Sequence, residues 1–250
     1  MNKRGPFDRS RAPIKPSSDQ AELQSRIDQI NKKAVVLLSG GLDSATTLYA
    51  AKVRNYQVHC LIFDYGQRHR REIRSARKVA RSAHCPSTVI KISLPWKGSS
   101  LLDKKKILPQ ERKVFKGIPS TYVPARNTIF LSFALSYAEA IGASRIFIGA
   151  NAVDFSGYPD CRPKFYEVFN KLARLATKCG IEHKAIKIET PLIGLKKYEI
   201  IKLGLRWGVP YQLTWSCYKG DNNPCGRCDS CLIRKKGFKE AGLKDPALPI

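Results

Sequence analysis

The chain has 250 residues, the size of one large domain or of one domain with an appendage, and is long enough to bury a substantial core. It carries 45 Lys and Arg against 20 Asp and Glu, a formal net charge of +25, so its surface attracts polyanions such as nucleotides and nucleic acid. No apolar run reaches about 18 residues and the N-terminus has no apolar core, which argues against a membrane span and a secretory signal.

Basic residues and prolines dominate the start of the chain. The stretch MNKRGPFDRSRAPIKPSSDQ shows no apolar pattern, so we expect residues 1–32 to be a disordered basic arm. We expect residues 33–213 to form the main domain and residues 214–250 to form a cysteine-rich appendage.

Short apolar runs alternate with helical patterns in the main domain. The predicted strands are 34–38, 57–63, 87–93, 144–151 and 185–189. One predicted helix starts at Asp43, and the others are 68–83, 126–141, 164–179 and 195–207. This alternation predicts an α/β fold with a doubly wound, mainly parallel five-stranded sheet. The Lys-rich connection 95–124 is long enough to indicate a flap or a mobile segment.

A glycine turn, Ser39-Gly40-Gly41, joins the first strand to the first helix. Its glycines allow positive φ and close approach of a ligand, and we expect Asp43 or Ser44 near the N-cap of the helix. The free N–H groups and the dipole of the helix then make an anion site. The lysine of a Walker loop is missing, and an aspartate repels phosphate unless it caps the helix or holds Mg²⁺. An ordinary strand–turn–helix joint is the alternative.

Two more polar segments that contain glycine follow predicted strands. They are FDYGQRH after the second strand and GANAVDFSGYPDCRP after the fourth. Ligands of doubly wound sheets bind at the carboxyl ends of the strands, where all three loops meet. Joining strands to helices does not require three polar, glycine-containing loops at one edge of the sheet, so these loops favour a binding site.

Four of the eight cysteines cluster in CYKGDNNPCGRCDSC, at Cys217, Cys225, Cys228 and Cys231. The tight spacing lets a loop close around a tetrahedral ion with four thiolates, which leaves no open position and predicts a structural zinc. An iron–sulfur cluster is the alternative. Without a secretion signal, the cluster indicates a metal site in a reducing, cytoplasmic compartment.

Several motifs together resemble a known family. SGGLDS resembles the S-G-G-x-D-S loop of the N-type ATP pyrophosphatases, the PP-loop superfamily, which adenylate a substrate and release pyrophosphate. FDYGQRH, PARN, GYPDCRP, TPL and the cysteine cluster occur in the same order in the QueC family of queuosine biosynthesis. The resemblance covers about residues 33–248.

The resemblance implies that 7-carboxy-7-deazaguanine, ammonia and ATP give the nitrile 7-cyano-7-deazaguanine. Carboxylate oxygen is a poor leaving group, and transfer to AMP makes it a good one, so ammonia can form an amide. Dehydrating the amide needs a second activation, so the family uses one site twice. The family also implies Mg²⁺, Zn²⁺ and a homodimer.

The resemblance assigns the site residues motif by motif. The nucleotide loop comprises Leu38, Ser39, Gly40, Gly41, Leu42, Asp43, Ser44, Ala45, Thr46, Thr47 and Leu48. The expected catalytic residues are Ser39, Asp43, Ser44 and Arg126, of which Arg126 balances charge on the α-phosphate. The expected substrate residues are Asp64, Tyr65, Gln67, His69, Asn127, Asp154, Tyr158, Asp160 and Arg162. Among these, Asp160 is expected to read the exocyclic amine and Arg162 the carboxylate, whereas helix capping is the alternative for residues 64–69.

Three other functions stay open. A PP-loop enzyme that thiolates tRNA would also be basic, and an enzyme that attaches a deazaguanine to a macromolecule would use the added charge. A zinc-stabilised RNA-binding protein is the non-enzymatic alternative. A solvated basic face explains the charge equally well, so nucleic acid is not a required partner.

Overall fold

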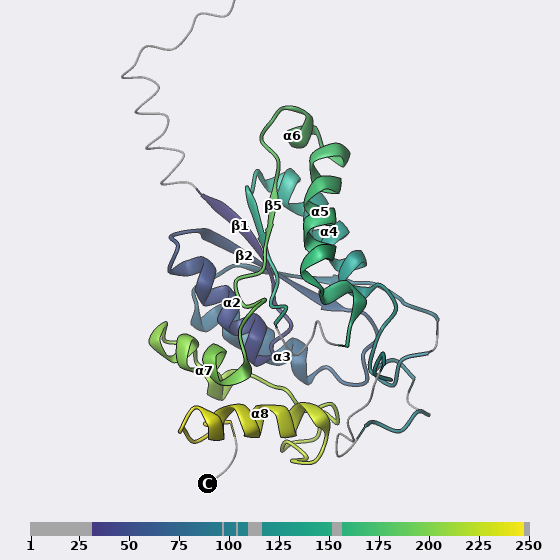
Figure 1. The fold of residues 1–250 in the computed structure, drawn as a ribbon, viewed down its shortest axis with the longest axis vertical. Helices are drawn as coiled ribbons and strands as arrows, with labels where there is room; N and C mark the ends of the chain where they lie inside the picture. Colours follow the sequence, from purple (N-terminus) through teal and green to yellow (C-terminus); the bar gives the residue numbers. More distant parts are fainter. Residues whose placement is uncertain (1–31, 97, 104, 110–116, 152–156, 248–250) are drawn as a thin grey trace, which may run out of the picture. The chain divides into compact units, whose positions relative to one another are not determined.

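A computed structural model of the chain describes residues 32–96, 98–103, 105–109, 117–151 and 157–247, and these residues form one compact unit (Figure 1). Apart from Lys32, the expected arm lies outside the described residues. So do parts of the Lys-rich connection and of the loop after the fourth strand.

Five parallel strands form a single sheet, as the alternating sequence pattern predicts. Their spatial order is β3 (Ser87–Lys91), β2 (Gln57–Asp64), β1 (Lys33–Leu37), β4 (Arg145–Phe147) and β5 (Lys187–Glu189). The chain builds outward from β1 to β3 and then returns to place β4 on the other side of β1. This reversal separates the loops that follow β1 and β4, which is where doubly wound sheets bind ligands.

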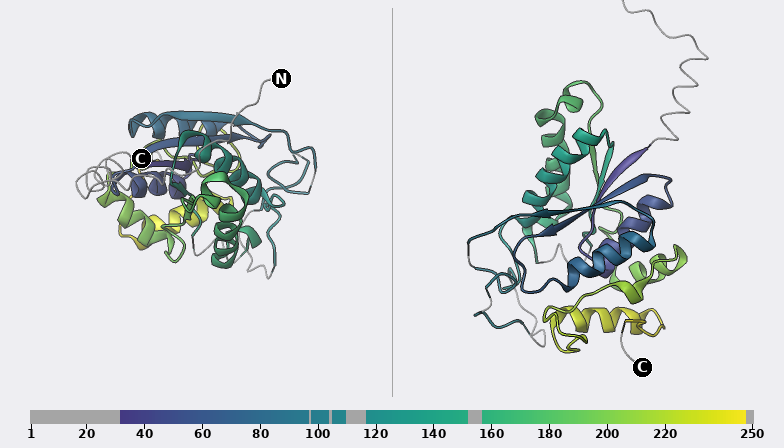
Figure 2. Two further views of the ribbon diagram at one scale, coloured as in Figure 1. Left: turned by 90° about the horizontal axis from the view of Figure 1, so that it is seen from above. Right: turned by 180° about the vertical axis from the view of Figure 1, so that it is seen from behind.

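Helices cover both faces of the sheet (Figures 1 and 2). On one face lie α2 (Leu42–Lys52), α3 (Arg71–Ser82) and α7 (Lys197–Arg206). On the other face lie α4 (Arg126–Ile141) and α5 (Pro163–Ala176). Residues of β1 alternate between the two apolar cores, with Val36 in the first and Val35 in the second. Both faces of the strand are therefore buried, as its unbroken apolar run predicts.

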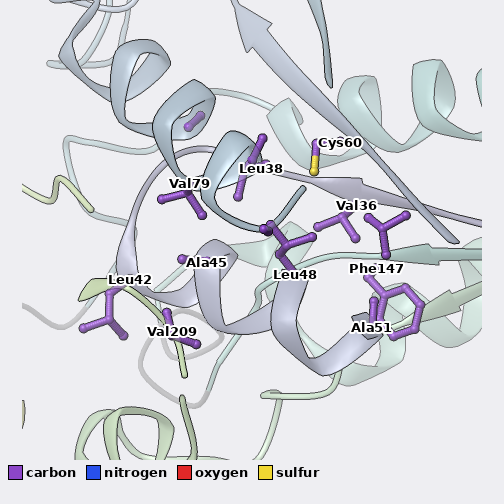
Figure 3. Packing of buried hydrophobic residues seen from close by; sticks show 14 of the residues in the cluster. Val36, Leu38, Leu42, Ala45, Leu48, Ala51, Cys60, Val79, Phe147 and Val209 are labelled. Carbon is purple, nitrogen blue, oxygen red and sulfur yellow. The ribbon is translucent and has the colours of Figure 1, made fainter. Parts of the chain in front are cut away.

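The core between the sheet and α2 fixes the position of the glycine turn. Leu48 and Ala51 of α2 pack beside Val36 and Phe147 of the sheet, and all four are fully buried (Figure 3). Because burial of a large apolar side chain contributes about 1.5–3 kcal/mol, this contact anchors α2 firmly against the end of β1.

Several predicted boundaries shift, and the three largest shifts have local reasons. The helix expected at 68–83 begins at Arg71, because the Arg68 N–H bonds the Leu101 carbonyl at 3.2 Å. The helix expected at 164–179 breaks at Thr177, which is extended and caps the short α6 (Lys178–Ile181). The strand expected at 144–151 ends at Phe147, and Gly149 beyond it lies against Asp43 and Thr47 of α2.

The cysteine-rich end of the chain contains a helix that the sequence pattern did not predict, α8 (Asp229–Glu240). It packs against α7, and Arg234 links it to the rest of the unit (Figure 1). The buried Arg234 guanidinium donates to the Asp245 carboxylate at 2.6 and 2.9 Å and to the Thr214 hydroxyl at 2.7 Å. The 3-10 turns η1 (Pro159–Cys161) and η2 (Tyr211–Leu213) complete the elements of the described residues.

Candidate active site

A cavity of about 300 Å³ opens at the carboxyl ends of β1, β2 and β4. This is the edge where the sequence places its three polar loops. All three contribute to the lining, together with the connection before α4 and the cysteine-rich end. The volume falls at the lower end of the range for small-molecule sites.

The glycine turn and the start of α2, residues 39–44, form the floor of the cavity and are here called the SGG loop. The Ser39 and Ser44 hydroxyls lie 3.0 Å apart, and the Ser39 N–H donates to Ser44 Oγ at 3.2 Å. The Ser44 hydroxyl also donates to the Gly41 carbonyl at 3.1 Å. The loop is thus held by its own hydrogen bonds. The N–H groups in the first turn of α2 have no partner within the helix, so an anion could bind to them at this loop.

Asp43 and Ser44 lie near the N-cap of α2, as expected, because Gly41 is the N-cap residue and both follow it in the first turn. The φ of Gly41 is −79° and therefore not positive. Only Gly40 has a positive φ, of 87°, and a side chain there would meet α3 instead of a ligand. A Cβ on Gly40 would collide with the Glu72 carbonyl and lie 2.6 Å from the Ala76 nitrogen. The missing side chain of Gly40 therefore permits packing against α3, whereas a Cβ on Gly41 would make only ordinary contacts with Ser39 and Trp215.

A lysine does reach the loop, from a distant part of the chain. Lys197, at the start of α7, donates to both carboxylate oxygens of Asp43 at 2.7 Å. Both side chains are largely buried. The sequence could not assign this pair because 154 positions separate its members. Lys197 compensates the charge that would otherwise make Asp43 repel phosphate.

The later residues of the expected nucleotide loop support α2 and do not line the cavity. The Thr46 hydroxyl donates to the Leu42 carbonyl at 2.9 Å and lies 2.8 Å from the Tyr211 hydroxyl. Ala45, Thr47 and Leu48 are fully buried. Within the expected loop the cavity lining is formed by Leu38, Ser39, Gly41, Leu42, Asp43 and Ser44.

The segment after β2 contributes Tyr65, Gln67 and His69 to the lining. Gln67 braces the turn, since its side-chain carbonyl accepts from the Tyr65 N–H at 2.9 Å. The His69 ring nitrogen lies 3.1 Å from the Cys217 carbonyl. Asp64 is outside the lining and pairs with Arg70 at 3.7 Å.

The start of α4 forms the opposite wall. Arg126 donates to the Tyr65 hydroxyl at 3.2 Å and lies over the Tyr65 and Phe130 rings. The Asn127 N–H donates to the Asp160 carboxylate at 2.8 Å, so Asp160 caps α4 from behind the wall. Arg126 and Asn127 line the cavity, whereas Asp160 does not.

The remaining expected substrate residues lie in different surroundings. Tyr158 lines the cavity, and its hydroxyl lies 2.7 Å from the Thr121 hydroxyl. Arg162 is exposed at the N-cap of α5 and is outside the lining. Asp154 lies outside the described residues.

Glu72 and Trp215 are two of the lining residues that the sequence analysis missed. Glu72 lies in the first turn of α3, and burial raises the pKa of its carboxyl to about 7. The sequence analysis did not single out Glu72 because the predicted helix 68–83 around it consists mainly of basic residues on its polar side. Trp215 lines the cavity from the cysteine-rich end, and its backbone N–H donates to the Gly40 carbonyl at 2.9 Å.

The four clustered cysteines converge, and residues 214–234 are here called the cysteine tail. The ligand atoms of Cys217, Cys225, Cys228 and Cys231 all lie within 4.8 Å of one another. Four sulfurs about 2.3 Å from one ion stand about 3.8 Å apart, so the arrangement fits a tetrahedral metal. Backbone N–H groups support it, including those of Cys225 and Lys219, which donate to the Cys217 sulfur at 3.3 and 3.4 Å.

In the described part of the chain, no helix combines the length and the apolar character that crossing a bilayer requires. The exposed basic residues of α3 are Arg74, Arg77, Lys78 and Arg81. They form no ion pair with another described residue.

Comparisons with known proteins agree on one family. The family model described as "Queuosine biosynthesis protein QueC" matches residues 33–242. The 7-cyano-7-deazaguanine synthase of Nostoc punctiforme is 56% identical over 219 residues, 86% of this chain and 98% of that protein. The enzyme of the same name from Thermoplasma acidophilum is 52% identical, over 86% of this chain and 91% of its own.

Among solved structures, the NMN synthetase of Francisella tularensis is similar over 88% of this chain and 82% of its own, at 17% identity and a TM-score of 0.49. At this distance the likeness adds nothing to the assignment of function.

Proposed function

The chain belongs to the QueC family of queuosine biosynthesis proteins, and we propose on this basis that it converts 7-carboxy-7-deazaguanine and ammonia to 7-cyano-7-deazaguanine with consumption of ATP. The observation that carries the proposal is the match to this family over residues 33–242, in which the SGG loop and the cysteine tail both fall. The described cavity agrees with it, because it brings an anion-binding loop, an arginine and polar side chains together.

We assign the phosphates of ATP to the SGG loop. Ser39, Gly41 and Ser44 offer backbone N–H and hydroxyl groups at the start of α2, where the helix dipole favours negative charge. Lys197 supplies the positive charge that a Walker lysine supplies elsewhere. Asp43 is the residue that would hold Mg²⁺, because a carboxylate is a hard oxygen ligand, and the ion would neutralise charge that develops on the phosphates.

Arg126 faces the same cavity from α4 and is assigned to the α-phosphate. The carboxylate of the substrate attacks this phosphorus, and pyrophosphate leaves into the SGG loop. Tyr65 orients the arginine through the hydrogen bond of 3.2 Å. A preorganised cation in a largely enclosed site stabilises such a transition state by a few kcal/mol.

For the deazapurine we retain the cavity residues Tyr65, Gln67, His69, Asn127 and Tyr158. The aromatic surface of Phe130 and Trp215 also lines the cavity, and it suits a flat heterocycle. Asp64, Asp160 and Arg162 have no place in this assignment, because they do not line the cavity.

We propose that the cysteine tail binds Zn²⁺ in a structural role. Four thiolates complete a tetrahedral shell, so no position remains for water or substrate. An iron–sulfur cluster would use the same four sulfurs and is distinguished by its colour and by its iron content. Because thiolate ligands must stay reduced, we also propose that the protein works in a reducing compartment, the cytoplasm.

We further propose a homodimer. On α5 the apolar residues Val168, Leu172 and Leu175 are exposed at spacings of four and three, so they lie along one side of the helix. A second copy is the simplest partner for such a stripe. Molar mass measured by light scattering tests this, and Leu172→Glu should convert the dimer to a monomer while Arg174→Glu, on another side of α5, should not.

The function is tested by incubating the chain with ATP, ammonium and 7-carboxy-7-deazaguanine and identifying the products by mass spectrometry. We expect the nitrile, AMP and pyrophosphate, in the absence of any nucleic acid. Formation of ADP and phosphate would contradict a pyrophosphatase loop. A strict requirement for tRNA would instead favour the thiolase function, with the exposed arginines of α3 as the tRNA-binding surface.

A further inference from the structure

Glu72 is a cavity residue that has no task in the reaction as described above. It lies in the first turn of α3, and its backbone carbonyl abuts Gly40 beside the phosphates' proposed position. Among the described residues that line the cavity, Asp43 is the only other acid, and Lys197 holds it. Glu72 is therefore the one uncommitted carboxylate in the described lining.

Charged and titratable groups surround Glu72 on several sides. Burial raises the pKa of Glu72 to about 7, the Arg126 guanidinium opposes this rise, and the Cys217 thiol adds to it. Tyr65 and His69 line the same cavity. Within the described residues, no hydrogen bond or ion pair occupies the Glu72 carboxylate, so its oxygens are available to a bound molecule.

The chemistry of nitrile formation needs a proton acceptor at nitrogen. In the first half, ammonia forms a bond to the acyl carbon, the bond from that carbon to the AMP oxygen breaks with its electron pair on AMP, and nitrogen gives up one proton. In the second half, the amide oxygen is adenylated. The carbon–oxygen bond then breaks in the same sense, and nitrogen gives up both remaining protons as the triple bond forms.

We propose that the Glu72 carboxylate accepts these protons from the reacting nitrogen in both halves of the reaction and passes them to water. This inference rests on the proposed nitrile-forming function. The nitrogen is the same atom in the same place each time, so one well-placed base serves both halves. Proton transfer to a positioned side chain typically contributes about 10²–10⁴-fold to a rate.

The position of Glu72 favours the nitrogen over the other partners a carboxylate could bind. The Glu72 carboxylate lines the same cavity as the Arg126 guanidinium and feels its charge. Because we assign Arg126 to the α-phosphate, to which the acyl carbon is linked in each adenylate, the carboxylate stands close to the reacting substituent. The amino edge of the deazapurine points away from that substituent. A metal ligand next to the Arg126 guanidinium would face a competing cation.

Glu72→Gln separates the proton-transfer steps from adenylation. Three assays are run on the full chain with its metal bound: exchange of pyrophosphate into ATP with the carboxylate substrate and no ammonia, amide formation with ammonium, and nitrile formation from the amide. Adenylation of the carboxylate removes no proton from nitrogen. We expect exchange within about 3-fold of wild type, and at least a 100-fold loss in the other two assays.

The matched control is Glu167→Gln, since Glu167 is exposed on α5 and pairs only with Lys164 in the described residues. It should leave all three rates unchanged. Glu72→Ala should regain part of its lost amide formation when formate is added, because formate can replace the missing carboxylate. An equal loss of pyrophosphate exchange in Glu72→Gln would assign the residue to ATP, metal or substrate binding and overturn the proposal, as would full activity in all three assays. Absence of exchange in the wild-type chain would overturn the proposed function itself, and this inference with it.

Discussion

The SGG loop and the cysteine tail touch each other, yet different forces hold them. The loop is fixed by hydrogen bonds between Ser39 and Ser44 and by the core beneath α2. The cysteine tail has four cysteines and Trp215 at its centre, and no large aliphatic side chain among its buried residues. The loop is therefore formed before a ligand binds, whereas the order of the tail would come from the metal ion that we propose for its four thiols.

This difference matters to the site because the tail forms part of the cavity wall. Trp215, Ser216 and Tyr218 line the cavity, and the Trp215 N–H donates to the Gly40 carbonyl at 2.9 Å. Arg71 of α3 lies over the Trp215 ring, which adds a second contact. Loss of order in the tail should thus reach the loop, while changes in the loop should leave the tail intact.

Removal of the metal should have the largest effect. Cys228→Ser or a strong chelator should release zinc, unfold residues 214–234 and abolish pyrophosphate exchange, because small metal sites without a core are folded by the ion. Zinc content, hydrogen exchange of the tail and the exchange rate are measured together. Acid should also release the metal, since the ligands must be deprotonated.

Cys179→Ser is the matched control for the metal prediction, because Cys179 lies outside the cluster. It should retain zinc and activity. A metal-free chain with an unchanged melting temperature and full activity would refute the structural role. Nitrogen or oxygen in the first shell of the X-ray absorption spectrum would indicate an open, catalytic zinc.

Loss of the lysine at the SGG loop should have the next largest effect. Lys197→Met leaves the Asp43 carboxylate uncompensated beside the phosphates, so pyrophosphate exchange should fall by about 10²–10³-fold. Lys196→Met changes the exposed neighbour in sequence and serves as the control. Equal losses in the two variants would show that Lys197 acts only through general charge. Zinc content should stay the same in both, which separates the loop from the tail.

Local patterns predicted the strands, the SGG loop and the cysteine cluster, because each depends on neighbouring residues. Lys197 and Glu72 could not be assigned, since their positions follow from how α7 and α3 pack onto the sheet. Asp160 shows the opposite failure. A polar residue after a strand can cap a neighbouring helix as readily as bind a ligand, and here Asp160 caps α4, which precedes it in the chain.

The unpredicted helix α8 has a similar cause. Few of its residues are apolar, and a buried ion pair between Arg234 and Asp245 helps to attach it. Apolar periodicity carries little signal for a helix attached in this way. The exposed basic residues along it look like a solvated tail in sequence, although Phe238 reaches the first core.

A substitution at Gly40 tests how tightly the loop is built into the fold. Gly40→Ala should destabilise the chain by about 3 kcal/mol, from a positive φ and from overpacking against the α3 backbone. Gly66→Ala is the control, because Gly66 also has a positive φ, of 82°, but nothing lies within 4 Å of the added carbon. It should lose only about 1 kcal/mol. Equal losses in denaturant titrations would mean that α3 moves aside freely.

Glu72 gives the smallest expected effect on stability, and the size of this effect depends on pH. Burial raises the pKa of its carboxyl from 4.5 to about 7 in the folded chain. Between these values the folded state binds more protons than the unfolded state, so this group's contribution to stability falls as pH rises. Glu72→Gln removes the titration, and the variant should be more stable than wild type at pH 8 by about 1–2 kcal/mol once screening in the open cavity is allowed for.

The measurement is the difference in melting temperature between wild type and Glu72→Gln, both with metal bound, from pH 5 to pH 8. For a chain of this size the difference should grow by about 3–6 °C across the range. Acid loss of zinc affects both proteins alike and cancels in the difference. Melting temperatures that stay parallel at every pH would mean that solvent reaches the Glu72 carboxylate freely. In that case, folding would not keep the Glu72 carboxyl protonated near neutral pH.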